Sequence, residues 1–293
     1  MHRFPFKRIP EKPLVSVILT SHNYGAYVGQ AIQSVYAQTY RPLELIVVDD
    51  GSSDDSRTVI EAAVQDPPVP TRVIFKEHGG QASALNAGFE VVQGDWVSAL
   101  DSDDCWQPTR VATMLEYARK FPDGGVYQHQ LDNGFGEDNR RLFVQGDILE
   151  EWLRLGWVNL AIRQDLVSVF VPTSGLFWRK EVLDKIFPIP EELVTCSDAY
   201  LTRCACIYGP LYSWPERLGT WREHGDNAGK RPQFGFHRFW VPVVMPAINA
   251  AFRERGIPVR FTYRPLAVLW EPVRLVREAL ARRRAKDVGR GVG

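Results

Sequence analysis

The chain of 293 residues has a hydrophobic content of 45% and a charged content of 24%, which fits a globular protein with a substantial core and excludes a disordered or fibrous chain. Lys+Arg and Asp+Glu both total 35, so the net charge of 0 gives no indication of a nucleic-acid partner. The four cysteines fit no paired C-x-x-C zinc pattern, and we expect reduced, mostly buried thiols in a cytoplasmic protein.

The first 120 residues or so alternate between apolar, β-branched runs typical of buried strands and the helical spacing of residues such as Val28, Ile32 and Val35. We predict strands over 14–21, 42–50, 71–77 and 95–100, and helices over 26–38, 56–65, 81–94 and 109–121. This alternation favours a Rossmann-like α/β fold, with a mostly parallel sheet flanked by helices.

The second half of the chain is less regular. We predict a hairpin over 124–147, helices around 148–156 and 179–186 with a strand over 166–175 between them, a helix over 197–209, and a pair of edge strands within 211–224. After about residue 230, the pattern predicts two helices over 237–256 and 265–286. The end is basic, since residues 271–293 contain seven Arg or Lys and three Asp or Glu.

Two segments of the sequence bear on membrane attachment and targeting. The apolar run 239–252 is interrupted by two prolines and is shorter than the ~20 residues that a membrane-spanning helix needs. The first 13 residues lack the apolar core of a signal peptide. We therefore expect neither a membrane span nor a secretory leader.

Carboxylates gather where two predicted strands end. Asp49 and Asp50 end one strand, and Asp101, Asp103 and Asp104 follow another. Ligands of open parallel sheets bind beyond the carboxyl ends of the strands, and carboxylates there can hold a hard divalent cation that also binds phosphate oxygens. Two structural explanations stay open, a helix N-cap cluster for the second group and a plain Asp-Gly turn for the first.

Three runs of sequence identify a family. In order, they are VSVILTSHNYGAYVGQAIQSVYAQTYRPLELIVVDDGSSDDS, HGGQASALNAGF and ALDSDDCWQP. Together they resemble the family 2 glycosyltransferases over roughly the first 110 residues, and TSGLFWRKEVL, CSDAYL and WREHGDNAG continue the resemblance more loosely. The resemblance implies a GT-A fold over 1–229, with a nucleotide-sugar half (about 14–120) and an acceptor half (121–229), followed by a small, basic, helical extension over 230–293.

The resemblance also implies the residues of a donor site. Asp103 and His224 would hold Mn²⁺ or Mg²⁺, with Asp101 nearer the ribose and Asp49 and Asp50 reading the base. The full set that would bind the nucleotide sugar is Thr20, His22, Asn23, Asp49, Asp50, Asn86, Asp101, Ser102 and Arg222. Arg222 would neutralise the diphosphate, because positive charge is needed where negative charge develops.

Asp198 opens the predicted helix in CSDAYL and resembles the catalytic base of the family, although Ser197 stands where an acidic residue is more common. An inverting transferase needs such a base to remove the proton of the acceptor hydroxyl. The structural alternative is that Asp198 only stabilises the start of its helix, which is worth ~0.3–1 kcal/mol.

The resulting hypothesis is a metal-dependent inverting glycosyltransferase that uses a nucleotide-diphosphate sugar, with a UDP-sugar favoured, in the synthesis of a cell-surface polysaccharide or glycoconjugate. The acceptor would be a saccharide or a lipid-linked saccharide. The last helix would contact an anionic membrane surface at the inner face of the membrane, or form a homodimer. The alternatives are a non-catalytic nucleotide- or carbohydrate-binding module on the same fold and, ranked lower, a nucleotidyltransferase.

Overall fold

The computed structural model describes residues 6–132, 171–209, 211–225, 227, 233 and 236–256. The chain divides into two compact units, Met1–Arg260 and Phe261–Gly293, and every described residue belongs to the first. The predicted boundary between 1–229 and 230–293 stays a prediction. Two predicted helices, over 148–156 and 265–286, lie wholly outside the described residues, as do residues 133–147 of the predicted hairpin and residues 166–170 of the predicted strand over 166–175.

Strands and helices alternate through the first half of the chain, as the sequence predicts. They are β1 (Val15–Ser21), α1 (Gly25–Tyr36), β2 (Leu43–Asp50), α2 (Ser56–Ala63), β3 (Thr71–Lys76), α3 (Gln81–Phe89), β4 (Trp96–Asp101), β5 (Cys105–Trp106) and α4 (Arg110–Lys120). The later elements are β6 (Val126–Asp132), a 3-10 turn η3 (Thr173–Gly175), β7 (Leu176–Arg179), α7 (Lys180–Leu183), α8 (Ser197–Ala205), β8 (Leu211–Thr220), a π-helix η6 (Phe236–Val244) and α9 (Met245–Glu254).

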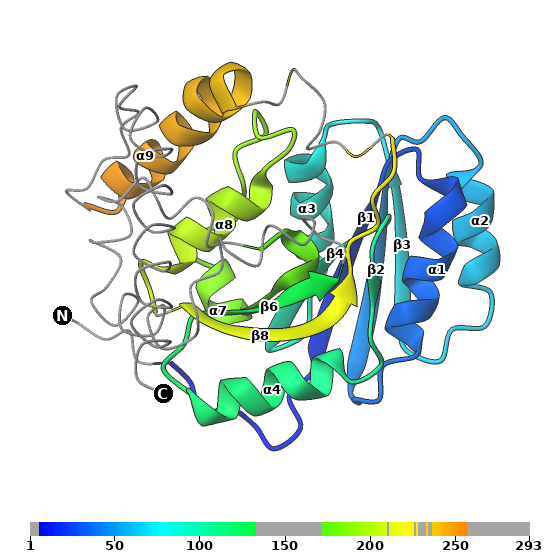
Figure 1. Ribbon diagram of the computed structural model, residues 1–293, viewed down its shortest axis with the longest axis horizontal. Coiled ribbons are helices and arrows are strands. Elements are labelled where there is room, and N and C mark those ends of the chain that lie inside the picture. The colour runs from blue at the N-terminus through cyan, green and yellow to red at the C-terminus, as the bar shows by residue number, and fades with distance from the viewer. Residues whose placement is uncertain are drawn as a thin grey trace, which may run out of the picture. The chain divides into compact units, whose positions relative to one another are not determined.

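The strands form one mixed sheet in the order β3-β2-β1-β4-β7-β6-β8-β5 (Figure 1). The first four strands by chain order are parallel to one another. The strand β7 runs antiparallel to both β4 and β6, and β8 is parallel to β6 and antiparallel to β5. The predicted α/β fold is therefore confirmed, and the regular parallel part of the sheet is the half built from β1 to β4.

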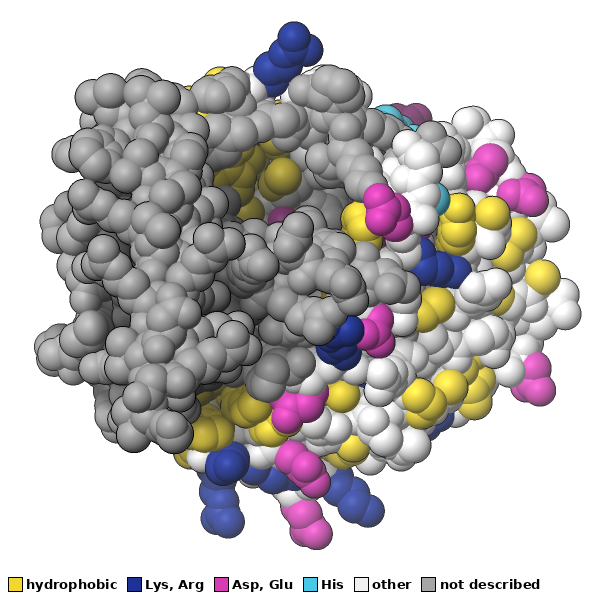
Figure 2. All heavy atoms as spheres, viewed as in Figure 1, with side chains coloured by type: hydrophobic (Ala, Val, Ile, Leu, Met, Phe, Trp, Pro, Cys, Tyr) yellow, Lys and Arg dark blue, Asp and Glu magenta, His cyan; other side chains and the backbone are white. Residues whose placement is uncertain are grey.

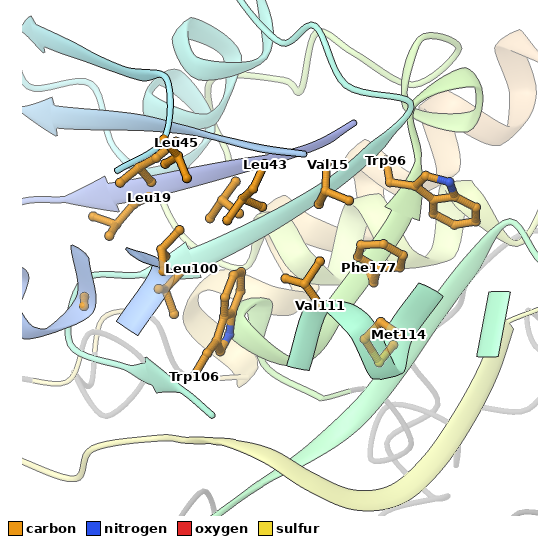
Figure 3. Close-up of a cluster of buried hydrophobic side chains, with 14 of the residues drawn as sticks. Val15, Leu19, Leu43, Leu45, Trp96, Leu100, Trp106, Val111, Met114 and Phe177 are labelled. Atoms are coloured by element: carbon orange, nitrogen blue, oxygen red, sulfur yellow. The ribbon is translucent and has the colours of Figure 1, made fainter. Parts of the chain in front are cut away.

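The strands β1 and β2 are buried on both faces, since nearly all of their residues are buried and successive residues of a strand point to opposite sides. On one face, Val17 and Leu19 of β1 pack in a core cluster with α1 and with Val111 of α4, and Figure 3 shows part of this cluster. On the other face, Ile18 lies beneath Gly88 of α3. Burial on two faces explains why β1 and β2 read as continuous apolar runs rather than alternating patterns.

The segment predicted as a pair of edge strands is a single strand, β8, which lies inside the sheet between β6 and β5. The pairing register with β6 jumps from Trp214 to Arg217, so Pro215 and Glu216 have no partner in β6. A proline has no N–H for a ladder hydrogen bond, and a bulge accommodates it within a strand. The prediction was wrong because Pro215 marks a bulge rather than a turn.

Two further predictions need adjustment. The end of the predicted strand over 166–175 is the 3-10 turn η3, and the strand that follows it begins only at Leu176. The first arm of the predicted hairpin is β6, whose described partners are β7 and β8. The second predicted arm lies outside the described residues, so the hairpin stays a prediction.

Within the described segments, every helix is too short or too polar to span a bilayer. Figure 2 shows acidic and basic side chains interspersed over the described part of one face, in keeping with the net charge of 0.

The contact of α3 with the sheet leads to a test of packing. A Cβ atom at Gly88 would lie 2.5 Å from Cγ2 of Ile18 and 3.3 Å from Cγ2 of Val48, so Gly88→Ala has to push α3 away from the sheet. We expect this variant to lose about 1–3 kcal/mol of unfolding free energy in urea titrations.

Gly29→Ala in α1 is the matched control, because among the described residues its new Cβ would meet a single atom, Cγ1 of Val59, at 3.2 Å. Both variants exchange a helical glycine for alanine and gain similar helix propensity, about 0.5–1 kcal/mol. Equal stability of the two variants would contradict the close packing of α3 on β1.

Candidate active site

The carboxyl ends of β1, β2 and β4 meet at one edge of the sheet, and most of the predicted site residues lie there. In the strand register, Ser21 of β1 lies beside Asp49 of β2, and Thr20 lies beside Asp101 of β4. The structure therefore brings together carboxylates and polar β1 residues that are separated by up to 81 positions in the sequence.

The loop between β4 and β5 is a tight turn held by a buried carboxylate. The backbone N–H of Asp104 donates to the carbonyl of Asp101 at 2.9 Å, which closes the turn. The Asp104 side chain is fully buried and accepts hydrogen bonds from Oγ of Ser174 at 2.5 Å and from the backbone N–H of Arg222 at 3.1 Å. Asp104 thus connects the turn to η3 and to the segment after β8.

The two predicted metal ligands are neighbours. Nε2 of His224 lies 3.0 Å from Oδ2 of Asp103, although the residues are 121 positions apart. The His224 ring stacks on Tyr27 of α1, with 4.8 Å between ring centroids, and its backbone N–H donates to Oδ1 of Asn227 at 2.8 Å. The Asn227 amide also lies 3.3 Å from Oδ2 of Asp103, so it holds both predicted ligands.

Negative charge is crowded at this edge of the sheet. Burial, followed by the charges of Asp103, Asp104 and Asp198, raises the pKa of Asp101 well above its ordinary value. Burial and the charge of Asp103 raise the pKa of Asp104 to about 7. Carboxylates this close favour either a shared proton or a bound cation.

The residues at this edge fit Mn²⁺ or Mg²⁺. Asp103 supplies carboxylate oxygen and His224 an imidazole nitrogen, both acceptable to Mn²⁺, and the surrounding carboxylates favour a positive charge. These two side chains, each 10% exposed, are the ones that would hold the ion.

Arg222 braces the loop that carries Asp103. Its guanidinium donates to the carbonyls of Asp103, Ser102 and Tyr27, and to Oε1 of Gln30 at 2.6 Å. It also lies over the ring of Tyr27, 4.9 Å from the centroid. The predicted contact with a diphosphate stays a prediction, since the described contacts of the side chain are with the protein.

Three buried polar atoms at the same edge have no hydrogen-bond partner among the described residues, namely Oγ of Ser21, Oδ2 of Asp49 and Oγ of Ser102. Each residue is 3% exposed or less. The other oxygen of Asp49 accepts the backbone N–H of Ser52 at 3.0 Å. An unsatisfied buried polar group costs about 1–3 kcal/mol, so a ligand with hydrogen-bonding groups is the natural partner for these atoms.

Asp50 is held differently from Asp49. Its carboxylate accepts hydrogen bonds from Nζ of Lys76 at 2.7 Å and from the backbone N–H groups of Gly79 and Gly80. Burial raises the pKa of Asp50, but these hydrogen bonds outweigh it and lower the pKa below its ordinary value. Asp50 therefore orders the loop before α3, and its predicted contact with a nucleotide stays a prediction.

A second group of potential metal ligands surrounds Asp50. The ligand atoms of His22, Asp50 and His78 lie within 4.8 Å of one another, and the two imidazole rings stack at 4.0 Å. Nδ1 of His78 lies 2.9 Å from Oδ2 of Asp50. The ammonium group of Lys76 already neutralises this carboxylate, so this group is less suited to a cation than Asp103 and His224.

Two predicted asparagines contact the protein. Oδ1 of Asn23 accepts the backbone N–H of Ser53 at 2.7 Å, which joins the loop after β1 to the loop after β2. The amide of Asn86 donates to the carbonyl of Ile189 and accepts its N–H, both at 2.8 Å. Asn86 thus fixes the segment that leads to α8, and its predicted contact with the donor remains a prediction.

Asp198 lies in the first turn of α8, close enough to the strand ends for its charge to raise the pKa of Asp101. Burial raises the pKa of Asp198 itself, against the opposing effects of a backbone hydrogen bond and of Arg203. Ser197, which replaces the acidic residue common in the family, donates its hydroxyl to the carbonyl of Leu193 at 3.3 Å. A carboxylate could not make that hydrogen bond.

Sequence reasoning missed several residues of this site. The structure adds Gln81, Asn227, Ser21 and His78 to the predicted set. Gln81 and Asn227 occur inside the runs HGGQASALNAGF and WREHGDNAG, which carry the family resemblance. The resemblance does not specify the contacts that these two side chains make. Their amide groups bind other protein groups, which a pattern of residue types does not reveal.

Comparison with known proteins shows which family the chain belongs to. Residues 16–187 match the family described as Glycosyl transferase family 2. An uncharacterised glycosyltransferase of Nostoc is 37% identical over 216 residues, which cover 73% of this chain and 66% of the relative. The chain thus spans slightly less than two thirds of the length of that relative.

Solved structures share the fold at low identity. TarS of S. aureus in complex with UDP-GlcNAc is 19% identical with a TM-score of 0.62, covering 81% of this chain and 66% of that one. The mannosyltransferase PcManGT of Pyrobaculum calidifontis, in complex with GDP-Man and Mn²⁺, is 16% identical with a TM-score of 0.60, covering 90% and 80%. The sheet and its flanking helices are therefore those of GT-A transferases.

The brace formed by Arg222 can be tested by substitution. Arg222→Met removes the hydrogen bonds to the carbonyls of Ser102 and Asp103, and we expect Mn²⁺ to bind about 10–100-fold more weakly because the loop is no longer held. The measurement is calorimetric titration of Mn²⁺ in the presence of UDP.

Arg217→Met is the matched control for this test. Arg217 precedes the same segment, but its side chain is 45% exposed and its ion pair among the described residues is with Asp132, at 3.1 Å. Such exposed pairs contribute little. If both variants bind Mn²⁺ equally well, Arg222 does not position the metal ligands.

Proposed function

Because the chain belongs to glycosyl transferase family 2, we propose that it is an inverting glycosyltransferase that uses a nucleotide-diphosphate sugar, with a UDP-sugar favoured. The observation that carries the proposal is the proximity of Asp198 to the Asp101 carboxylate at the end of β4, since one side chain, Gln81, contacts both Asp101 and the backbone N–H of Ser197. A donor site and a candidate base then lie at one edge of the sheet, as a direct displacement requires.

The donor site follows from charge and hydrogen bonding. A pyrophosphate carries about two negative charges, which carboxylates alone would repel, so Asp103 and His224 would hold a divalent cation that neutralises part of this charge. When bound, this cation supplies positive charge to the departing diphosphate. The unpartnered Oδ2 of Asp49 is suited to accept an N–H of the base, which would discriminate among bases.

The transfer step requires one proton acceptor and no covalent enzyme intermediate. The acceptor hydroxyl gives its proton to the carboxylate of Asp198, and its oxygen forms a bond to the anomeric carbon. The bond from that carbon to the diphosphate oxygen breaks, and its electron pair leaves with the nucleoside diphosphate. The raised pKa of Asp198 makes its carboxylate a stronger base than an ordinary aspartate.

The nature of the acceptor is a further part of the proposal. A saccharide or lipid-linked saccharide in the synthesis of a cell-surface polysaccharide or glycoconjugate fits a family 2 transferase. The last predicted helix lies outside the described residues, so membrane contact or dimerisation through it stays a prediction. The cytoplasmic location also stays a prediction.

Removal of the proposed base tests the reaction directly. Asp198→Asn keeps the shape of the side chain but cannot take the proton, so we expect the transfer rate to fall by about 10²–10⁴-fold while UDP and Mn²⁺ still bind. UDP release from UDP-glucose, UDP-galactose and UDP-GlcNAc with a panel of saccharide acceptors measures the rate, and calorimetry measures binding.

The matched control is Asp184→Asn, since Asp184 is an exposed partner of Lys180 after α7. In the wild type, the rate should fall as the pH drops through the raised pKa of Asp198, so the acid limb lies above the ordinary value of 3.8. Equal rates in the two variants would exclude Asp198 as the base. UDP binding without turnover in any variant, the wild type included, would favour the non-catalytic module.

A further inference from the structure

The start of α3 is fastened to the segment that leads to α8. The backbone N–H groups of Gln81 and Ala82 donate to the carbonyls of Val194 and Leu193, at 3.0 and 3.3 Å. The first N–H groups of a helix have no partner within the helix. Here the segment before α8 supplies carbonyl partners for two of them. Gly80, with a φ of 87°, permits this approach, since a Cβ atom there would lie 2.8 Å from Cα of Val194.

The side chain of Gln81 extends the same attachment into the site. The backbone N–H of Ser197 donates to Oε1 of Gln81 at 3.1 Å. A backbone N–H can only donate, so the carbonyl end of the amide faces Ser197 and the NH₂ end faces the other way. That end lies 3.4 Å from Oδ1 of Asp101 and 3.3 Å from Oγ1 of Thr173.

One amide therefore spans the two functional parts of the site. Its donor end contacts the buried carboxylate of Asp101 at the end of β4, two residues before Asp103. Its acceptor end contacts Ser197, the residue directly before Asp198. Among the described residues, the side chain that donates a hydrogen bond to the Asp101 carboxylate is Gln81.

We propose that Gln81 is a positioning residue that sets the place of the base Asp198 relative to the donor carboxylate Asp101. This inference rests on the proposed function and adds to it a residue outside the predicted set. Leucine at position 81 would lose both contacts. Glutamate would still accept the N–H of Ser197 but would place a negative charge against Asp101.

A displacement of about 1 Å between reacting groups can cost roughly a hundredfold in rate. We therefore expect Gln81→Leu and Gln81→Glu to lower kcat by about tenfold to a hundredfold, with the KM of the donor and the affinity for UDP and Mn²⁺ unchanged. Gln93→Leu is the matched control, because Gln93 is exposed beyond the other end of α3. Rates are measured as UDP release from the three UDP-sugars, at a temperature below the unfolding transition of every variant.

The double variant with Asp198→Asn separates positioning from a purely structural role. If Gln81 acts through Asp198, Gln81→Leu causes no further loss of rate in the Asp198→Asn background. A full additional loss there, a Gln81→Glu variant with the wild-type rate, or a change confined to the KM of the donor would each overturn the proposal. A wild-type protein that releases no UDP from any donor would instead remove the proposed function, and this inference with it.

Discussion

The buried carboxylate of Asp104 is the contact on which the rest of the site depends. A desolvated carboxylate is costly unless it is fully hydrogen-bonded, and Asp104 takes its partners from η3 and from the segment after β8. These two hydrogen bonds fix the turn after β4 against two distant parts of the chain. As a result, Asp103 faces His224, and the Arg222 side chain can donate a hydrogen bond to the backbone of the same turn.

The fold supplies the edge on which this turn is built. Parallel pairing of β1, β2 and β4 aligns their carboxyl ends, and burial on both faces keeps those ends in place. The helix α3 then joins this edge to α8 through three attachments, at Asn86, at the start of the helix and at the Gln81 side chain. Contacts with this helix thereby hold the candidate base Asp198 near the Asp101 carboxylate.

The sequence predicted the alternation from β1 to α4 well, because buried strands and amphipathic helices have clearly different hydrophobic periods. It failed at β8, where a proline within a bulge resembles a turn. Asp103 and His224 could be paired only through the family resemblance, since nothing in their spacing connects them. The amides of Gln81 and Asn86 show the remaining limit, because residue type does not reveal whether an amide meets a ligand or, as Asn86 does, the backbone of Ile189.

The most direct test of a metal-assisted nucleotide site at these strand ends is thermal unfolding with UDP, GDP, dTDP and CMP, each with and without Mn²⁺. A ligand at a hundred times its Kd adds about 2.7 kcal/mol of stability, which corresponds to a shift of several degrees. We expect a shift with one nucleotide, UDP being favoured, that is large only when Mn²⁺ is present. The absence of a shift with any nucleotide, or equal shifts with and without Mn²⁺, would contradict it.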